Sequence, residues 1–349
     1  MANIKDVAKK AGVSISTVSN VINGTKYVSD ELRERVNKAI TELNYEVDPV
    51  ARSLKSKKTM SIGVIITDIN RVFFPQVIKG IQDTATRNGY SITFCNSNDS
   101  FDMEKRFVQM MENSQLDGII LDSVADAGQQ CYFKELCCLG SGKKRIPVVS
   151  IERRIDDFPI DSVVVNNAEG GSMAARHLIE CGCRKVAHIA GPANSFMALE
   201  RLQGYRNELQ KRGLDLDDAR LVMGDYSPLS GYQATKQLLI NGVDFDGIFA
   251  ANDQMAIGAI KAIKEHGYSI PEHIKVIGFD NTFVSSIVEP SLTTINVPKY
   301  KLGSSAVETL IKRMENRLCE TACIELPINL VVRQSTDLKG DKNWDLYGW

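Results

Sequence analysis

The sequence lacks the features of a membrane, secreted or metal-binding protein. No apolar run approaches the roughly 18 residues that a membrane span needs, and the N-terminus has no apolar signal-peptide core. The eight cysteines include no CxxC pair, and a chain of 349 residues needs no disulfide staples. His177 and Cys181 lie four residues apart, but the further ligands of a tetrahedral metal site are not evident nearby. We therefore expect a soluble, cytoplasmic protein with reduced thiols, without metal, cofactor or membrane partner.

Motifs of the common nucleotide-binding enzymes and hydrolases are missing as well. No GxGxxG follows the first predicted strand, and there is no GxSxG. The stretch GSGKKR at 140–145 lacks both the first glycine of a phosphate loop and the Ser or Thr after its lysine, so it indicates a basic turn. Glu152, Asp253 and Asp280 stand at the ends of predicted strands, without a histidine or nucleophile at a matching strand end. These carboxylates favour hydrogen bonding to a ligand over acid–base catalysis.

Charge is balanced over the whole chain but not along it. The 42 basic and 43 acidic side chains give a net charge of -1, which argues for neither nucleic acid nor an anionic membrane. Residues 1–60, however, hold 11 basic and 7 acidic side chains. The basic N-terminal end is therefore predicted to be a separate unit.

Residues 3–45 have the pattern of three short helices. Asn3 can cap the first helix, Gly12 turns the chain, and a second helix begins near Ser14 with small polar residues. A third helix is predicted to start near Ser29. A helix, a turn and such a second helix match a helix-turn-helix, whose second helix enters the DNA major groove. On spacing alone, residues 4–24 also fit a small bundle whose lysines serve solubility.

Residues 48–58, DPVARSLKSKK, are predicted to form a short helix. Asp48 is a good N-cap, and Pro49 takes the first helical position, where its missing N–H costs nothing. Isolated helices this short are marginal in water. We expect this one to form only when a partner holds it.

From residue 61 onward, apolar strands alternate with amphipathic helices. Such βα units predict parallel sheets covered by helices, with ligands bound beyond the carboxyl ends of the strands. This alternation of strands and helices occurs in two successive runs, which predicts two doubly wound lobes. The strand candidates are 61–69, 91–97, 117–124 and 148–152 in the first run, and 161–167, 185–191, 219–225, 247–253 and 275–281 in the second.

Motifs along almost the whole chain resemble the LacI/GalR family of bacterial transcription repressors. They are DVAKKAGVSISTVSNVINGTKYVS and NYEVDPVARSLKSKK near the N-terminus, then ERLQGY, ANDQMAIG, VIGFDN and EPSLTTI. The resemblance implies an α/β fold with a three-helix helix-turn-helix headpiece, a hinge helix and a two-lobed, periplasmic-binding-protein-like core of two doubly wound parallel sheets. The implied divisions are a headpiece at 1–47, a hinge at 48–58, a first subdomain at 60–162 with about 295–322, a second at 163–292 with about 323–337, and a tail at 338–349.

The resemblance also implies which residues contact DNA. Ser14 begins the recognition helix, Ile15, Ser16 and Asn20 match base-reading positions, and Asn can bridge adenine while Ile packs on a thymine methyl. Phosphate-contacting positions fall on Thr17, Asn23 and Lys26. The hinge helix would enter the minor groove as a pair, with its DNA-contacting positions at Ala51, Arg52, Leu54 and Lys55.

For the core, the resemblance implies an effector bound between the lobes. The matching positions are Phe73, Phe74, Glu152, Arg201, Tyr226, Asn252, Asp253 and Asp280. Aromatic rings, an arginine fork and strand-end carboxylates suit a polyol, since hydroxyls both donate and accept hydrogen bonds. Glu152 stands where relatives have Asp, and Ser195 and Met197 stand where purine-responsive relatives have a charged and a small polar group. We therefore expect a sugar or a sugar phosphate rather than a purine.

The expected partners are palindromic operator DNA, this effector and a second copy of the chain. A homodimer is favoured because the tail KGDKNWDLYGW lacks the leucine heptads that make some relatives tetramers. The effector would change operator affinity through the hinge helices, so the protein is predicted not to be an enzyme. The alternative is a sugar-binding protein or a cleft enzyme with a non-functional DNA-binding head.

Overall fold

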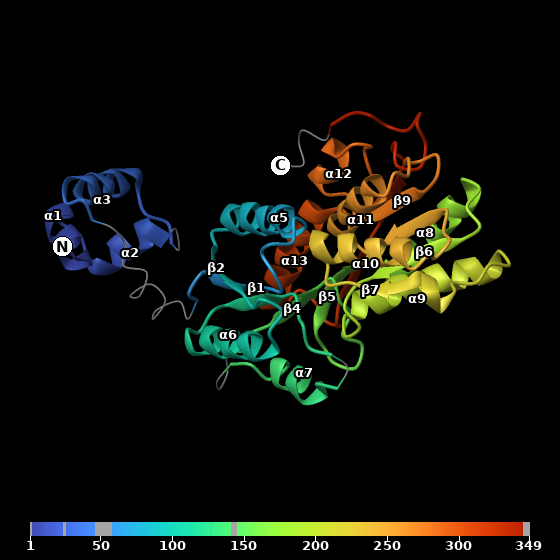
Figure 1. Ribbon diagram of the computed structural model, residues 1–349. Coiled ribbons are helices and arrows are strands. Elements are labelled where there is room, and N and C mark those ends of the chain that lie inside the picture. The colour runs from blue at the N-terminus through green and yellow to red at the C-terminus, as the bar shows by residue number, and fades with distance from the viewer. Residues whose placement is uncertain (1, 24–25, 46–57, 127, 141–144, 345–349) are drawn as a thin grey trace. The chain divides into compact units, whose positions relative to one another are not determined.

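The computed structural model describes residues 2–23, 26–45, 58–126, 128–140 and 145–344 (Figure 1). These residues form two compact units, one extending to Thr59 and the other beginning at Met60. The predicted hinge helix lies outside the described residues except for Lys58. Among the described helices, none combines the length and the apolar character of a membrane-spanning segment.

The small N-terminal unit contains the three predicted helices. They are α1 (Ile4–Ala11), α2 (Ile15–Asn23) and α3 (Asp30–Glu42). Small and β-branched side chains at helical spacing make its core, namely Val7, Ala8, Ala11, Val18, Val36 and Ala39. The Lys10 ammonium and the Glu42 carboxylate, 2.8 Å apart, join α1 to α3 at the surface.

The first sheet of the large unit has six strands, all parallel, in the order β11-β5-β4-β3-β1-β2. The strands are β1 (Ser61–Ile66), β2 (Ser91–Asn96), β3 (Gly118–Leu121), β4 (Val148–Ile151), β5 (Asp161–Val165) and β11 (Cys323–Leu326). Alternation along β1 sends Ile62 and Val64 into one core and Ile65 into another. Helices therefore cover both faces: α5 (Phe74–Arg87) packs with α13 (Lys299–Met314) on one, and α6 (Phe101–Asn113) and α7 (Gln130–Leu136) lie on the other.

The second sheet also has six strands, in the order β12-β10-β9-β8-β6-β7. They are β6 (Val186–Ala190), β7 (Leu221–Met223), β8 (Gly247–Ala250), β9 (Lys275–Asp280), β10 (Thr293–Asn296) and β12 (Asn329–Val331). All neighbours are parallel except β12, which runs antiparallel to β10. Two helix pairs cover this sheet, α8 (Asn167–Glu180) with α9 (Phe196–Lys211), and α10 (Pro228–Ile240) with α11 (Asp253–Glu265). A short 3-10 turn (Asp218–Arg220) precedes β7, and α12 (Phe283–Ile287) follows β9.

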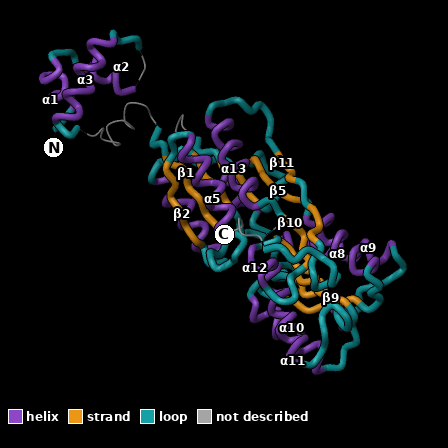
Figure 2. Tube along the Cα trace, turned by 90° about the horizontal axis from the view of Figure 1, so that it is seen from above, coloured by secondary structure: helices purple, strands orange, loops and turns teal. Residues whose placement is uncertain are grey.

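Two doubly wound sheets confirm the predicted fold class, but three strands near the crossings differ from the prediction. The predicted boundary at residue 162 puts most of β5 in the second lobe, and the predicted divisions put β11 there as well, yet both strands belong to the first sheet (Figure 2). β10 was divided at about residue 295, yet all of it lies in the second sheet. The apolar pattern that predicts a strand carries no information on which neighbour it joins. The chain crosses between the sheets after β5, after β10 and between β11 and β12.

Candidate functional site

The first helix of the small unit, α1, is fixed at both ends. Asn3 and Asp6 form a capping box at the start of α1, in which each side chain accepts a hydrogen bond from the other's backbone N–H. Gly12 ends α1 with a φ of 64°, a left-handed conformation that favours glycine. From α3, the Arg35 guanidinium donates to the carbonyl of Ala11 at 2.7 Å. Both ends of α1 are therefore fixed, and its C-terminal end is tied to α3.

The start of α2 presents small polar groups to solvent. The Ser14 hydroxyl accepts a hydrogen bond from the Thr17 N–H at 3.1 Å and so caps the helix. Ser14, Ile15 and Ser16 are exposed, Ile15 by 45%, whereas Val18, further along the helix, is fully buried. An apolar side chain left this exposed at the start of a capped helix is available for a contact outside the unit.

The other predicted DNA-contacting positions differ in exposure, and some of them lie outside the described residues. Thr17 and Asn20 are half-buried on α2, and Lys26 is exposed just beyond it. The side chain of Asn23 lies outside the described part of the chain, as do the hinge positions Ala51, Arg52, Leu54 and Lys55. Sequence reasoning missed Tyr27, which is 90% exposed next to Lys26. Its aromatic type predicts burial, so only the structure reveals it as a surface residue.

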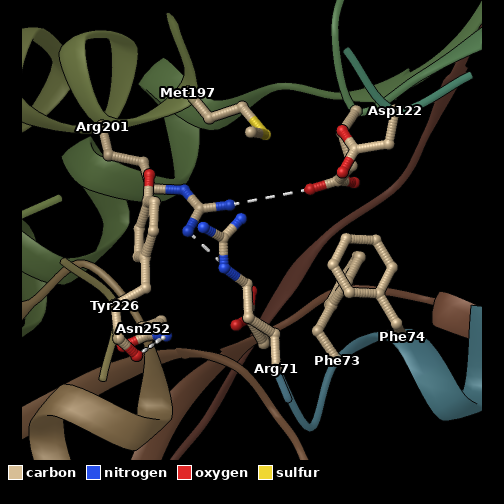
Figure 3. A pocket seen from close by; sticks show the side chains of 10 residues that line it. Arg71, Phe73, Phe74, Asp122, Met197, Arg201, Tyr226 and Asn252 are labelled. Carbon is tan, nitrogen blue, oxygen red and sulfur yellow. Dashed lines mark hydrogen bonds and ion pairs between the residues drawn. The ribbon is translucent and has the colours of Figure 1, made fainter. Parts of the chain in front are cut away.

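The large unit holds a cavity between its two sheets, at the carboxyl ends of their strands (Figure 3). The space between its lining side chains amounts to about 390 Å³ when the solvent that opens into it is counted. Both lobes contribute side chains, and most are charged or aromatic. The lining residues are Arg71, Phe73, Phe74, Asp122 and Glu152 from the first lobe and Met197, Arg201, Tyr226, Asn252 and Asp280 from the second.

Arg71 and two phenylalanines follow β1 and form one side of the cavity. The Arg71 guanidinium donates to both carboxylate oxygens of Asp99, at 2.8 and 2.7 Å, and to the Thr67 hydroxyl at 3.0 Å. Its carbon also lies 4.8 Å from the centre of the Tyr226 ring in the second lobe. Phe73 and Phe74 are buried and meet edge to face, with ring centres 5.4 Å apart. These rings offer a C–H or π surface beside a charged fork.

Arg201 extends from α9 into the second-lobe side of the cavity. Its Nε donates to Asn167 Oδ1 at 2.8 Å, one Nη donates to the carbonyl of Ala251 at 2.6 Å, and the guanidinium stacks over Phe279 at 3.7 Å. Glu152 and Asp280 approach it at 4.0 and 3.9 Å. The arginine is buried and its fork is held in one orientation.

Tyr226 and Asn252 are held by one another and by a helix cap. The Asn252 amide donates to the carbonyl of Tyr226 at 2.9 Å, while its oxygen accepts from the Met255 N–H and caps α11. The Tyr226 hydroxyl shares a hydrogen bond of 2.8 Å with Ser195, the N-cap of α9. Tyr226 has a φ of 70°, which lies in the left-handed region. The second-lobe side is thus tied together before any ligand arrives.

Three carboxyl groups border the cavity, and burial raises the pKa of each. For Glu152 the pKa rises to about 8, although the Arg201 guanidinium opposes the rise. Burial likewise raises the pKa of Asp122 and of Asp280, again with an arginine working against the effect. A charged carboxylate is therefore costly in this cavity until hydrogen-bond donors reach it.

Seven of the eight predicted effector positions line the cavity, and Asp253 does not. The Asp253 carboxylate is fully buried and accepts hydrogen bonds from Thr282 and Thr294, so it braces the loop after β9. Three lining residues are not among the predicted effector positions, namely Arg71, Asp122 and Met197. Asp122 follows directly after β3, which ends at Leu121, whereas the predicted strand ran to residue 124 and hid this strand-end carboxylate. No local pattern marks Arg71.

Comparison with known proteins gives related results for both units. Residues 3–48 match the family described as bacterial regulatory proteins, lacI family, and residues 175–336 match the periplasmic binding protein-like domain. The ribose operon repressor of Halalkalibacterium halodurans is 36% identical over 98% of this chain and 99% of that protein. The repressor PurR of Proteus mirabilis is 36% identical over 96% of this chain and 97% of its own length. A lac repressor dimer bound to operator and the anti-inducer ONPF superposes with a TM-score of 0.87 at 31% identity, covering 96% of this chain and 99% of that one.

Proposed function

The chain belongs to the lacI family of bacterial regulatory proteins, and we propose that it represses transcription from a palindromic operator under the control of a sugar-type effector. Membership in this family makes the chain a DNA-binding repressor with an effector-binding core rather than an enzyme. The operator symmetry, the dimer and the class of effector are our proposals. A repressor acts on the chromosome, which places it in the cytoplasm.

The proposal for DNA recognition is supported by the exposed start of α2. Ile15 and Ser16 project from a capped helix, and Asn20 lies about one turn further along it. An exposed isoleucine suits a thymine methyl, and an asparagine amide suits adenine N6 and N7. Thr17 and Lys26 would contact phosphates, which fix the register of the helix without reading sequence.

A dimer would present two such helices to two half-sites. The similar lac repressor structure is a dimer bound to operator, which supports the same assembly here. We propose that Leu54 of the hinge enters the minor groove, with Ala51, Arg52 and Lys55 around it. Because these positions lie outside the described residues, their support is the sequence resemblance alone.

A sugar or sugar phosphate is proposed as the effector because of what lines the cavity. Two guanidinium groups, three carboxyls, the Asn252 amide and two phenylalanine rings surround a space at the strand ends of both sheets. Sugar hydroxyls donate and accept hydrogen bonds in pairs, and sugar C–H faces pack on aromatic rings. This combination of groups is the main support for a sugar or sugar phosphate as the effector.

A purine is the second candidate, because several relatives are PurR proteins. Two second-lobe positions weigh against it. Ser195 caps α9 and bonds Tyr226, and Met197 lines the cavity with a thioether, so this corner offers neither a charge nor a strong hydrogen-bond group to a base edge. The ribose operon repressor, of equal identity, is consistent with a sugar.

The test is binding to operator DNA measured by fluorescence anisotropy at several salt concentrations. Palindromic sites selected from random DNA are expected to bind far more tightly than shuffled sites, and sugars, sugar phosphates or purines are then added. A non-functional head predicts no difference between selected and shuffled DNA. A response to hypoxanthine or guanine, with none to sugars or sugar phosphates, would replace the sugar by a purine.

A further inference from the structure

We propose that Asp122 and Glu152 make the cavity selective for an uncharged polyhydroxy compound, a free monosaccharide, over the phosphate ester of the same sugar. The inference rests on the proposed function, since it concerns the effector of the same site. It resolves a choice that the residue types alone leave open, because arginines suit phosphates while carboxylates suit hydroxyl donors.

Asp122 contributes a buried acceptor that nothing in its surroundings uses. The residue follows β3 and is 1% exposed. Its Oδ2 accepts hydrogen bonds from the Thr67 hydroxyl at 2.6 Å and from the Thr67 N–H at 3.3 Å. Its Oδ1 has no hydrogen-bond partner in the described part of the chain, although the residue lines the cavity. Threonine thus holds the carboxylate in place through one oxygen and leaves the other for a donor.

Glu152 repeats this arrangement at the end of the neighbouring strand, β4. Its backbone has a φ of 65°, so a strained turn places the side chain in the cavity wall. Its Oε2 lies 4.0 Å from Arg201, while Oε1 is buried without a partner among the residues described. Leaving a buried acceptor unsatisfied costs free energy, and the pKa of about 8 reflects that cost. A ligand hydroxyl that donates to Oε1 would remove this free-energy cost.

The arginines are already engaged by carboxylates and carbonyls. Arg71 forms a two-pronged pair with Asp99, which stands outside the cavity lining. Arg201 donates to Asn167 and to a backbone carbonyl and faces Glu152 and Asp280. A phosphate would have to take an arginine away from these groups.

The charges around the cavity also disfavour an anion. Three carboxyls and two guanidinium groups line it, and Asp99, outside the lining, pairs with the Arg71 guanidinium. The nearby Lys299 ammonium donates to the backbone carbonyls of Asp280, Asn281 and Val297, outside the lining. Burial already raises the pKa of all three carboxyls, so a phosphate dianion would enter a site that tolerates added negative charge poorly and would be repelled by any carboxyl that stays ionised. A neutral sugar brings donors without charge.

Calorimetric titration of the full-length protein tests the inference. The probes are ribose, xylose, galactose, glucose and fructose, each beside its phosphate monoester. We expect at least one free sugar to bind, and its phosphate ester to bind about 100-fold more weakly or worse. The variants Asp122→Asn and Glu152→Gln each place an amide where the carboxyl group stood, which replaces one of its two oxygens by an NH2 donor. Each variant should bind the free sugar about tenfold more weakly or worse, and the difference in affinity between the sugar and its ester should narrow.

Glu104→Gln is the matched control, because it changes a buried carboxylate of the same lobe that does not line the cavity. Its oxygens accept hydrogen bonds from Ser123, Tyr132 and the Val124 N–H. Any loss of folding stability in this variant should leave the ratio of sugar to ester affinity unchanged. That ratio is the decisive quantity, since a purely structural defect lowers both affinities together.

Three results would overturn the inference. They are an ester that binds the wild-type protein as tightly as its sugar, a ratio that the Asp122 and Glu152 variants leave unchanged, and the absence of binding by every free sugar tested. Failure of the proposed function is seen separately, in operator binding measured without any ligand. A protein that binds operator and responds to a sugar phosphate would keep the proposed function and lose this inference.

Discussion

The two proposed sites of this molecule are built in opposite ways. On the small unit, the groups offered to DNA stand on the outside of α2, Ser14 caps the start of that helix, and Arg35 holds the end of α1 before it. In the large unit, the groups offered to a ligand are buried, and Glu152 and Arg201 are part of the packing itself. The difference teaches that specificity for DNA can change here at little cost in stability, whereas specificity for the effector is coupled to the stability of the core.

The largest expected effect comes from Arg201→Ala. The change removes the hydrogen bonds to Asn167 and the Ala251 carbonyl and leaves Glu152 and Asp280 without the cation between them. We expect effector binding to fall below detection and the unfolding free energy to drop by about 3–5 kcal/mol. Calorimetric titration with the effector measures its affinity, and urea unfolding measures the unfolding free energy. Retained effector affinity would show that the effector binds elsewhere.

The next effect is a pH-dependent gain from Glu152→Gln. Glu152 faces Arg201 and Lys299 as favourable charges and Asp122 and Asp280 as unfavourable ones, and burial raises its pKa from 4.5 to about 8. A carboxyl whose pKa is raised by folding favours the native state fully below pH 4.5 and loses this contribution as the pH rises towards 8. At pH 9 the ligand-free variant should therefore be more stable than the wild-type protein by about 2–4 kcal/mol, and at pH 4 nearly equal to it.

Urea unfolding at both pH values, without ligand, measures this difference. Glu104→Gln again serves as the comparison in the same lobe. A variant less stable than the wild-type protein at pH 9 would mean that the ion pair with Arg201, not burial, dominates at Glu152.

A smaller effect is expected on the outside of α2. Asn20→Ala should cost about 1–3 kcal/mol in operator binding and relax the base preference at one position of each half-site. Because the change lies on the half-buried surface of a capped helix, the unfolding free energy should change much less than it does for Arg201→Ala. Binding-site selection from random DNA reads the preference directly. An unchanged preference would remove Asn20 from the base-reading positions.

The smallest effect is expected from Lys26→Ala, which changes a proposed phosphate-contacting position rather than a base-reading one. An exposed ammonium that contacts phosphate should weaken all DNA by a similar, modest factor and reduce the slope of affinity against salt by about one unit. Affinity for selected and shuffled DNA over a salt series measures it. A changed base preference with an unchanged slope would reverse the roles of Lys26 and Asn20.

The sequence predicts the elements of this fold better than their partners. The apolar pattern located β5 but counted it with the second run, and the divisions that the resemblance implies put β11 in the second subdomain, whereas both strands belong to the first sheet. Pairing depends on where the connections end. Strand-end carboxylates pointed to Glu152 and Asp280, because parallel strands bring their carboxyl ends together. The same rule misjudged Asp253, whose carboxylate is taken by threonines of the neighbouring loop and strand. Side-chain direction after a strand end depends on the next few backbone angles, which residue type alone does not set.

The three crossings between the sheets limit how the lobes can move. They follow the ends of β5, β10 and β11, so the chain connects the two halves three times rather than once. Sliding one half along the other would strain all three connections, whereas bending about the line they define would strain none of them much. We expect ligands of different chemistry to move the protein along a single opening angle and to differ only in how far. Solution scattering with several ligands would test this, because independent motions would give curves that no one-parameter series could fit.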